Sequence, residues 1–108
     1  MTWNIDMVLM AKARKAWGDE KQVKMAIEEM GELLTAISHR DRGRCEDKDV
    51  AEEIADCLIT LSCISQNYGE KSVVDWIAQK QMRLKVRLGC NYYENEAEII
   101  AKRERIPF

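Results

Sequence analysis

The chain has 108 residues, of which 46% are hydrophobic, and a formal net charge of -2. This length predicts one domain over 1–108 with a small core, and the nearly balanced charge argues against a surface for a nucleic acid polymer. No apolar run approaches the about 20 residues that cross a bilayer, and the N-terminus lacks the basic start and cleavage site of a signal peptide. We therefore expect a cytoplasmic protein that binds no membrane.

Apolar residues recur at helical spacing from end to end, and the single proline, Pro107, stands at the C-terminal end, where it interrupts no helix. The pattern predicts an all-α protein, a bundle of four to five helices. The expected helices cover about residues 3–17, 21–39, 47–68 and 71–88, and the segment 90–108 has room for one more short helix. Since four modest helices cannot cover this much apolar surface alone, we also expect a homodimer or homotetramer.

The second and third expected helices each carry an apolar stripe at helical spacing. We expect these stripes to face the core: Val23, Ile27, Met30, Leu34 and Ile37 in the second helix, and Val50, Ile54, Cys57, Leu61 and Ile64 in the third. At the start of the third helix, Asp47 or Asp49 is the expected cap. Glu52 stands three residues after Asp49, as in a capping box.

Acidic residues interrupt both helices in two groups, Glu28, Glu29 and Glu32 in the second helix and Glu53 and Asp56 in the third. Residues three apart lie on one face of a helix, so Glu29 and Glu32 share a face, as do Glu53 and Asp56. The polar stretch HRDRGRCEDKD between them predicts a turn. If the helices form an antiparallel hairpin about the middle of this turn, Glu29 stands level with Asp56, and Glu32 with Glu53. We therefore expect four carboxylates to converge between the two helices.

Four carboxylates in one small volume repel each other strongly, so such a group takes up protons or binds cations. The donors are all oxygens, with no nearby histidine or cysteine, and oxygen donors favour a hard divalent ion. Mg²⁺ characteristically combines a few carboxylates with water and substrate phosphates. The sequence therefore indicates Mg²⁺-assisted phosphate chemistry, with Mn²⁺ as an alternative ion.

Acidic residues on helices also occur outside metal sites. Surface glutamates commonly pair with neighbouring lysines such as Lys24 or Lys48, and an acidic face can bind a partner in a non-enzymatic helical interaction or regulatory module. A di-iron four-helix bundle is excluded because it needs Glu-x-x-His pairs, and the single histidine, His39, has Ala36 three positions before it. The cysteines form no Cys-x-x-Cys pair, which argues against a zinc site.

The order Glu-Glu-x-x-Glu, a helix-to-helix turn and Glu-x-x-Asp resembles the pattern of the MazG-like all-α nucleoside triphosphate pyrophosphatases. In this sequence 20 residues separate the two parts, from Glu32 to Glu53, and the resemblance runs from about residue 17 to 88. It implies an oligomeric helical enzyme that hydrolyses nucleoside triphosphates to a nucleoside monophosphate and pyrophosphate. Non-standard or pyrimidine deoxynucleotides, removed as nucleotide-pool house-cleaning, are among the implied substrates.

The resemblance also implies a role for each acidic residue. Glu29, Glu32, Glu53 and Asp56 would hold Mg²⁺. Glu28 would support them or orient the attacking water, so that all five form the catalytic set. The assignment of the general base among the five stays open.

Cationic and aromatic side chains are expected to bind the rest of the nucleotide. Lys80, Arg83 and Arg87 stand at spacings of three and four on the fourth helix, so they form one line that can contact phosphates. The alternative is a solvated basic face near a helix C-terminus. Trp17, just before the second helix, is the candidate contact for the nucleobase, or else a core or interface residue.

Overall fold

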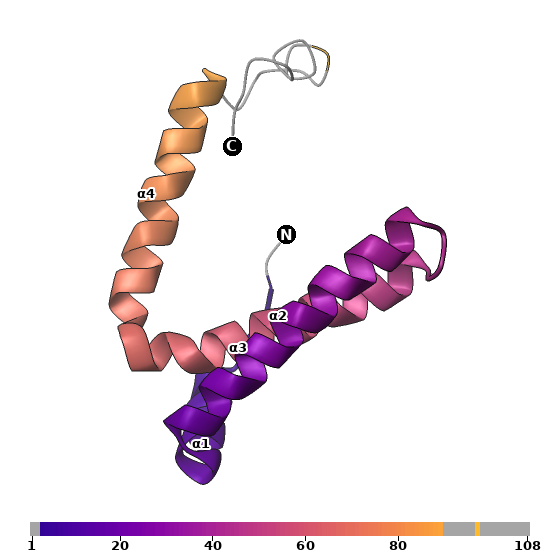
Figure 1. Cartoon of the computed structure of the whole chain (residues 1–108). Helices are drawn as coiled ribbons and strands as arrows, with labels where there is room; N and C mark the ends of the chain where they lie inside the picture. Colours follow the sequence, from indigo (N-terminus) through magenta and orange to yellow (C-terminus); the bar gives the residue numbers. More distant parts are fainter. Residues whose placement is uncertain (1–2, 90–96, 98–108) are drawn as a thin grey trace. The chain divides into compact units, whose positions relative to one another are not determined.

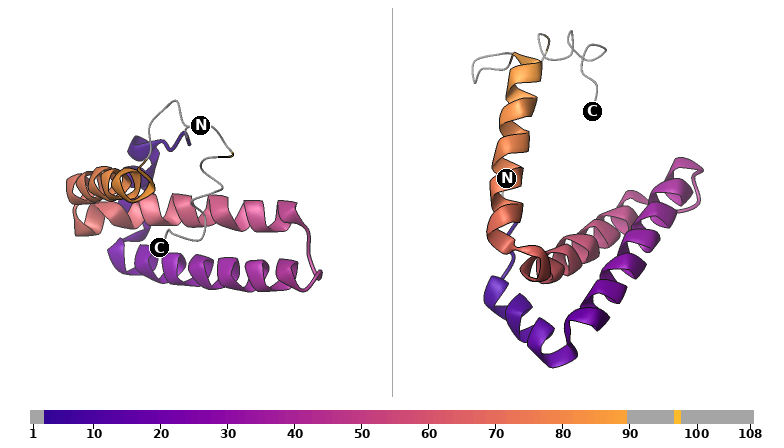
Figure 2. Two further views of the ribbon diagram at one scale, coloured as in Figure 1. Left: turned by 90° about the horizontal axis from the view of Figure 1, so that it is seen from above. Right: turned by 60° about the vertical axis from the view of Figure 1, so that its left-hand side comes forward.

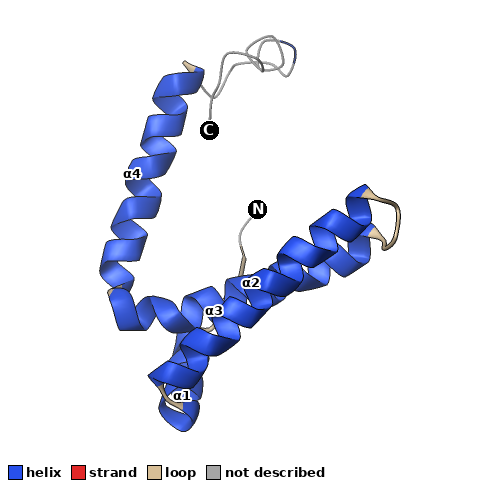
Figure 3. Ribbon diagram, viewed as in Figure 1, coloured by secondary structure: helices blue, strands red, loops and turns tan. Residues whose placement is uncertain are grey.

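The computed structural model describes residues 3–89 and residue 97. These residues form four α-helices and no strand, which confirms the predicted all-α fold (Figures 1 and 3). The helices are α1 (Met7–Trp17), α2 (Asp19–Asp41), α3 (Asp47–Tyr68) and α4 (Glu70–Leu88). The helix predicted within 90–108 lies outside the described residues.

The chain divides into two compact units, Met1–Glu70 and Lys71–Phe108. The first unit contains α1, α2 and α3, and the second contains α4 from its second residue onward. The prediction that 1–108 form a single domain stays a prediction. In the described part of the chain, none of the helices combines the length and the hydropathy that a bilayer-spanning segment needs.

A single residue, Gly18, joins α1 to α2. The side chain of Asp6 caps the first turn of α1, so this helix begins at Met7, four residues later than predicted. Gly18 has a φ of 85°, a conformation that favours glycine, and its N–H donates to the Arg14 carbonyl at 2.7 Å. α2 begins immediately afterwards at Asp19, two residues earlier than predicted.

α2 and α3 lie side by side and antiparallel, joined by a turn at residues 42–46 (Figure 2). Gly43 lies in this turn with a φ of 72°, which again favours glycine. Arg40 near the end of α2 pairs with Asp47 at the start of α3. The turn therefore reverses the chain as the polar stretch of the sequence predicts.

The predicted cap of α3 is wrong, because the capping residue is Glu46 rather than Asp47 or Asp49. Glu46 has the extended backbone of a capping position, and its N–H donates to the Asp49 carboxylate at 2.8 Å. Glu52, which we expected in a capping box, is an exposed residue within the helix. The difference arises because the capping residue is Glu46, the residue before the helix, and because Asp49 rather than Glu52 accepts from the backbone N–H at this position.

The interior of the first unit is small. Among its described residues the buried apolar side chains are Met10, Ala26, Cys57 and Cys63, and the polar side chains of Gln22 and Thr60 are buried as well. The Met10 sulfur of α1 lies 3.3 Å from the Cys63 sulfur of α3, so α1 packs against α3. Ala26, which is 0% exposed, lets the backbones of the hairpin approach closely.

The predicted core stripe of α2 is wrong. Val23 alone is half-buried, and the other side chains of the stripe are exposed: Ile27, Met30, Leu34 and Ile37. α2 instead buries the face that carries Gln22, Ala26 and Glu29, at spacings of four and three. Periodicity identifies residues that share a face, but it does not decide which face meets the neighbouring helix.

The predicted stripe of α3 is only partly buried. Cys57 is buried, Val50 and Ile64 are half-buried, and Ile54 and Leu61 are exposed. Leu34 of α2 and Ile54 of α3 expose 71% and 40% of their surface, respectively. Both helices of the hairpin therefore present apolar side chains to their surroundings.

Candidate metal centre

Three carboxylates meet where α2 and α3 pack together. One oxygen each of Glu29 from α2 and of Glu53 and Asp56 from α3 lies within 4.8 Å of the other two. All three side chains are half-buried. The turn at 42–46 reverses the chain, so that the acidic group of α2 returns beside the acidic group of α3. We refer to Glu29, Glu53 and Asp56 as the carboxylate cluster.

The other two acidic residues of the motif lie differently. Glu32 is exposed and lines the same pocket as Glu53, so it adjoins the cluster. Glu28 is also exposed and lines a pocket beside the cluster. The structure thus brings together three of the four predicted ligands, places Glu32 at their edge and leaves Glu28 outside.

The electrostatics of the cluster disfavour its charged form. Burial raises the pKa of the Glu29 carboxyl above its ordinary value of 4.5, and the negative charges of Glu32 and Asp56 raise it further. Burial likewise raises the pKa of the Glu53 carboxyl, and the charges of Glu32 and Asp56 are again the next causes. A cation among these carboxylates would offset both the burial of their charges and the repulsion between them.

Two oxygens of the cluster, Oε2 of Glu29 and Oε2 of Glu53, are buried and have no hydrogen-bond partner among the residues that the structure describes. The lysines that the sequence offered as partners pair elsewhere: Lys24 with Glu20 at 3.4 Å and Lys48 with Glu46 at 3.5 Å. Within residues 3–89 the ion pairs use none of the cluster carboxylates. The donor set is all oxygen, which fits a hard divalent cation such as Mg²⁺.

An open pocket of about 630 Å³ borders the cluster and shares Glu53 with it. Its wall consists of Glu28, Gly31, Glu32, Thr35, Ala36, His39, Cys45, Asp49 and Glu53. Four of these residues are acidic, so an anionic ligand can enter favourably only together with a cation. The pocket and the cluster therefore form one candidate site.

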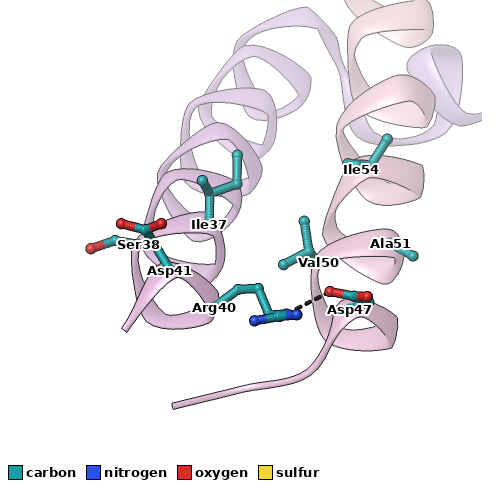
Figure 4. A pocket seen from close by; sticks show the side chains of 8 residues that line it. All are labelled: Ile37, Ser38, Arg40, Asp41, Asp47, Val50, Ala51 and Ile54. Atoms are coloured by element: carbon teal, nitrogen blue, oxygen red, sulfur yellow. Dashed lines mark hydrogen bonds and ion pairs between the residues drawn. The ribbon is translucent and has the colours of Figure 1, made fainter. Parts of the chain in front are cut away.

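A second open pocket, of about 610 Å³, lies at the turn end of the hairpin. Figure 4 shows that Ile37, Val50 and Ile54 line it and that Arg40 pairs with Asp47 at its edge. The Asp47 carboxylate already has a cationic partner, and no cluster residue lines this pocket. Its chemistry therefore gives no reason to place a metal ion or a reaction here.

None of the predicted substrate-binding residues is among those that line the pocket beside the cluster. Trp17 is 55% exposed and lines a different pocket, of about 420 Å³, together with Lys21 and Lys24. Lys80, Arg83 and Arg87 lie on α4 in the second unit and are exposed. A role for these four residues in substrate binding stays a prediction.

The expectation that no histidine or cysteine lies near the carboxylates is wrong, and sequence reasoning missed several residues beside the cluster. The Cys57 thiol donates to the backbone carbonyl of Glu29 at 3.2 Å and so joins α3 to α2 at the level of the cluster. Its position one residue after Asp56 is the signal that could have identified it. His39, in the last turn of α2, and Cys45, in the turn at 42–46, also line the pocket beside the cluster, and no spacing rule predicts this because it depends on the conformation of the turn.

The described residues thus form an all-α fold in which oxygen donors from two antiparallel helices meet at one candidate cation site. The model of the MazG nucleotide pyrophosphohydrolase domain matches residues 18–84, which is more than half of the chain. The chain therefore belongs to the MazG nucleotide pyrophosphohydrolase domain family, as the acidic motif predicts. No curated protein and no solved structure gives a significant match.

Proposed function

We propose that this protein is a Mg²⁺-dependent enzyme that hydrolyses nucleoside triphosphates to a nucleoside monophosphate and pyrophosphate. Its family indicates a nucleotide pyrophosphohydrolase. The observation that carries the proposal is the carboxylate cluster, in which two buried oxygens lack any partner among the described residues. Such a set of charges is favourable only with a cation, and a nucleotide brings phosphate oxygens that complete the coordination of Mg²⁺ or Mn²⁺.

In this proposal Glu29, Glu53 and Asp56 hold Mg²⁺, and Glu32 at their edge completes the set. When bound, the ion would polarise the α-phosphoryl group and offset the charge of the triphosphate. Glu28 lines the pocket but lies outside the cluster, so its carboxylate can orient the attacking water and accept its proton.

The chemistry requires no covalent bond to the protein. The water oxygen forms a bond to the α-phosphorus while the bond from that phosphorus to the bridging oxygen breaks. Pyrophosphate then leaves with the electron pair, and the proton of the water passes to the carboxylate. The products are a nucleoside monophosphate and pyrophosphate.

The remaining contacts to the nucleotide are assigned by the same proposal. Lys80, Arg83 and Arg87 share a face of α4 and supply cationic donors for the phosphates. Trp17 supplies an aromatic face for the nucleobase. Non-standard or pyrimidine deoxynucleotides are the proposed substrates, and house-cleaning of the nucleotide pool is the proposed role. The cytoplasmic location stays a prediction.

A homodimer or homotetramer is part of the proposal. The exposed apolar side chains Ile27, Leu34, Ile37 and Ile54 lie on two neighbouring helices, and a second copy of the chain is the proposed partner that covers them. Light scattering coupled to size exclusion would measure the mass in solution. A monomer at all concentrations would refute this part of the proposal.

The activity is tested by measuring pyrophosphate release from a panel of nucleoside triphosphates with and without Mg²⁺. Asp56→Ala should abolish release while helix content is retained. Glu52→Ala is the matched control, because Glu52 lies on the same helix but outside the cluster, and it should keep near-normal rates. A non-enzymatic interaction module would release no pyrophosphate from any nucleotide, and near-normal rates in Asp56→Ala would exclude that residue as a ligand.

A further inference from the structure

We infer that Trp76 is a positioning residue that holds Lys80 and Arg83 ready for a polyphosphate, an inference that rests on the proposed function. In α4 the Lys80 Nζ lies 5.8 Å, and the Arg83 Cζ 5.7 Å, from the centroid of the Trp76 ring. Both distances are within the range of cation–π contacts. One aromatic ring thus contacts both of the first two cations that we propose to bind phosphates.

The spacing along α4 accounts for this arrangement. Lys80 and Arg83 follow Trp76 by four and seven residues, so all three side chains lie on one face of the helix. The two cations are three residues apart, and like charges at this spacing repel each other. The negative face of the ring attracts both and keeps their charged ends together.

The ring contacts leave the hydrogen-bond donors of both cations available. A guanidinium group that lies against an aromatic ring keeps its N–H groups for other acceptors, and the lysine ammonium has three donors. In the described part of the chain, neither Lys80 nor Arg83 pairs with a carboxylate. A ligand with several adjacent negative groups, such as a triphosphate chain, therefore matches this pair better than a ligand with a single charge.

The test measures the binding of inorganic tripolyphosphate with Mg²⁺ to the full chain by isothermal titration calorimetry. Each exposed cation–π contact corresponds to about a two- to five-fold factor in an equilibrium constant. Trp76→Leu keeps an apolar side chain that favours a helix but removes the aromatic face and both contacts, and it should raise Kd about 4- to 25-fold. Trp76→Phe retains an aromatic face and should recover most of the affinity. Val74→Ala, on the same helix, is the control and should bind like the wild type.

A double-mutant cycle separates positioning from a general structural role. In a Lys80→Gln/Arg83→Gln background, Trp76→Leu should have no further effect, because the cations that the ring holds are absent. The inference is overturned if Trp76→Leu binds like the wild type, if its effect persists in that background, or if the wild type does not bind tripolyphosphate. Leucine and phenylalanine variants that lose affinity equally would also overturn it.

The binding and activity measurements together distinguish failure of the positioning role of Trp76 from failure of the proposed function. Tripolyphosphate binding with the expected Trp76 effects, but no release of pyrophosphate from any nucleotide, would refute the enzyme and support the positioning role. Hydrolysis of a nucleotide together with unchanged binding in Trp76→Leu would support the enzyme and refute the positioning role.

Discussion

Replacement of Glu53 by glutamine tests the candidate metal centre most directly. Glu53→Gln keeps the size of the side chain but removes one negative charge, so that of the three carboxylate pairs in the cluster only Glu29 with Asp56 remains. The variant should therefore be at least as stable as the wild type without metal. It should also bind Mg²⁺ more weakly, because one anionic ligand has become neutral.

The expected size of the effect follows from mass action. A ligand at 10 times its Kd stabilises the folded state by about 1.4 kcal/mol, which raises Tm by about 6–11 °C for a domain of this size. Loss of a group that only supports a metal ligand costs about 10- to 100-fold in metal affinity, so loss of a ligand itself should cost at least about 100-fold. At the same Mg²⁺ concentration the variant would gain only about 0.1 kcal/mol, or less than about 1 °C.

The assay is thermal unfolding followed by circular dichroism, with protein freed of metal by EDTA and then titrated with Mg²⁺. Glu52→Gln is the matched control: it removes the same charge from the neighbouring residue of α3, which is exposed and outside the cluster. It should show the Mg²⁺-induced rise of the wild type. An equal rise in Glu53→Gln, or an equal loss in Glu52→Gln, would refute the reasoning.

Three further predictions concern pH and packing. In EDTA, lowering the pH from about 7 towards 4.5 should raise the Tm of the wild type relative to a Glu29→Gln/Glu53→Gln variant. Because the pKa values of Glu29 and Glu53 are raised in the folded state, this state takes up protons before the unfolded state does. Curves of Tm against pH that run parallel for the two proteins would contradict the raised pKa values. Ala26→Leu should cost about 1–3 kcal/mol in urea unfolding, because its side chain is 0% exposed, and a cost below about 0.5 kcal/mol would show that the hairpin can open to admit it. Gly18→Ala should destabilise by about 1–2 kcal/mol because of its φ of 85°, whereas Gly31→Ala, with open space around it, should stabilise by about 0.5–1 kcal/mol; urea titrations that give both the same sign would contradict this.

The helices themselves could be predicted because glycine and the apolar period are local signals. Gly18 and Gly43 mark the connections around α2, and both have the positive φ that glycine tolerates best. The buried face of α2 could not be predicted. Its stripe of Ile27 and Leu34 is the more apolar side, but the helix buries the side of Ala26, because packing against α3 depends on shape as well as on hydropathy.

The carboxylate cluster could be predicted from spacing and the position of the turn. Glu29 and Asp56 are brought to one level once the chain reverses at 42–46, and this requires only helix geometry. The pocket beside the cluster could not be predicted, because its wall includes Cys45 from the turn, whose conformation no periodic signal describes.

All the residues of the cluster fall within residues 29–56 of the sequence, a stretch of 28 residues that one short turn folds back on itself. Contacts so close along the chain form quickly, since a shorter loop loses less entropy when it closes. We therefore expect the candidate cation site to form with the hairpin, before contacts between residues further apart along the chain, such as Met10 with Cys63. An ion bound at that stage would stabilise the hairpin before the rest of the chain folds.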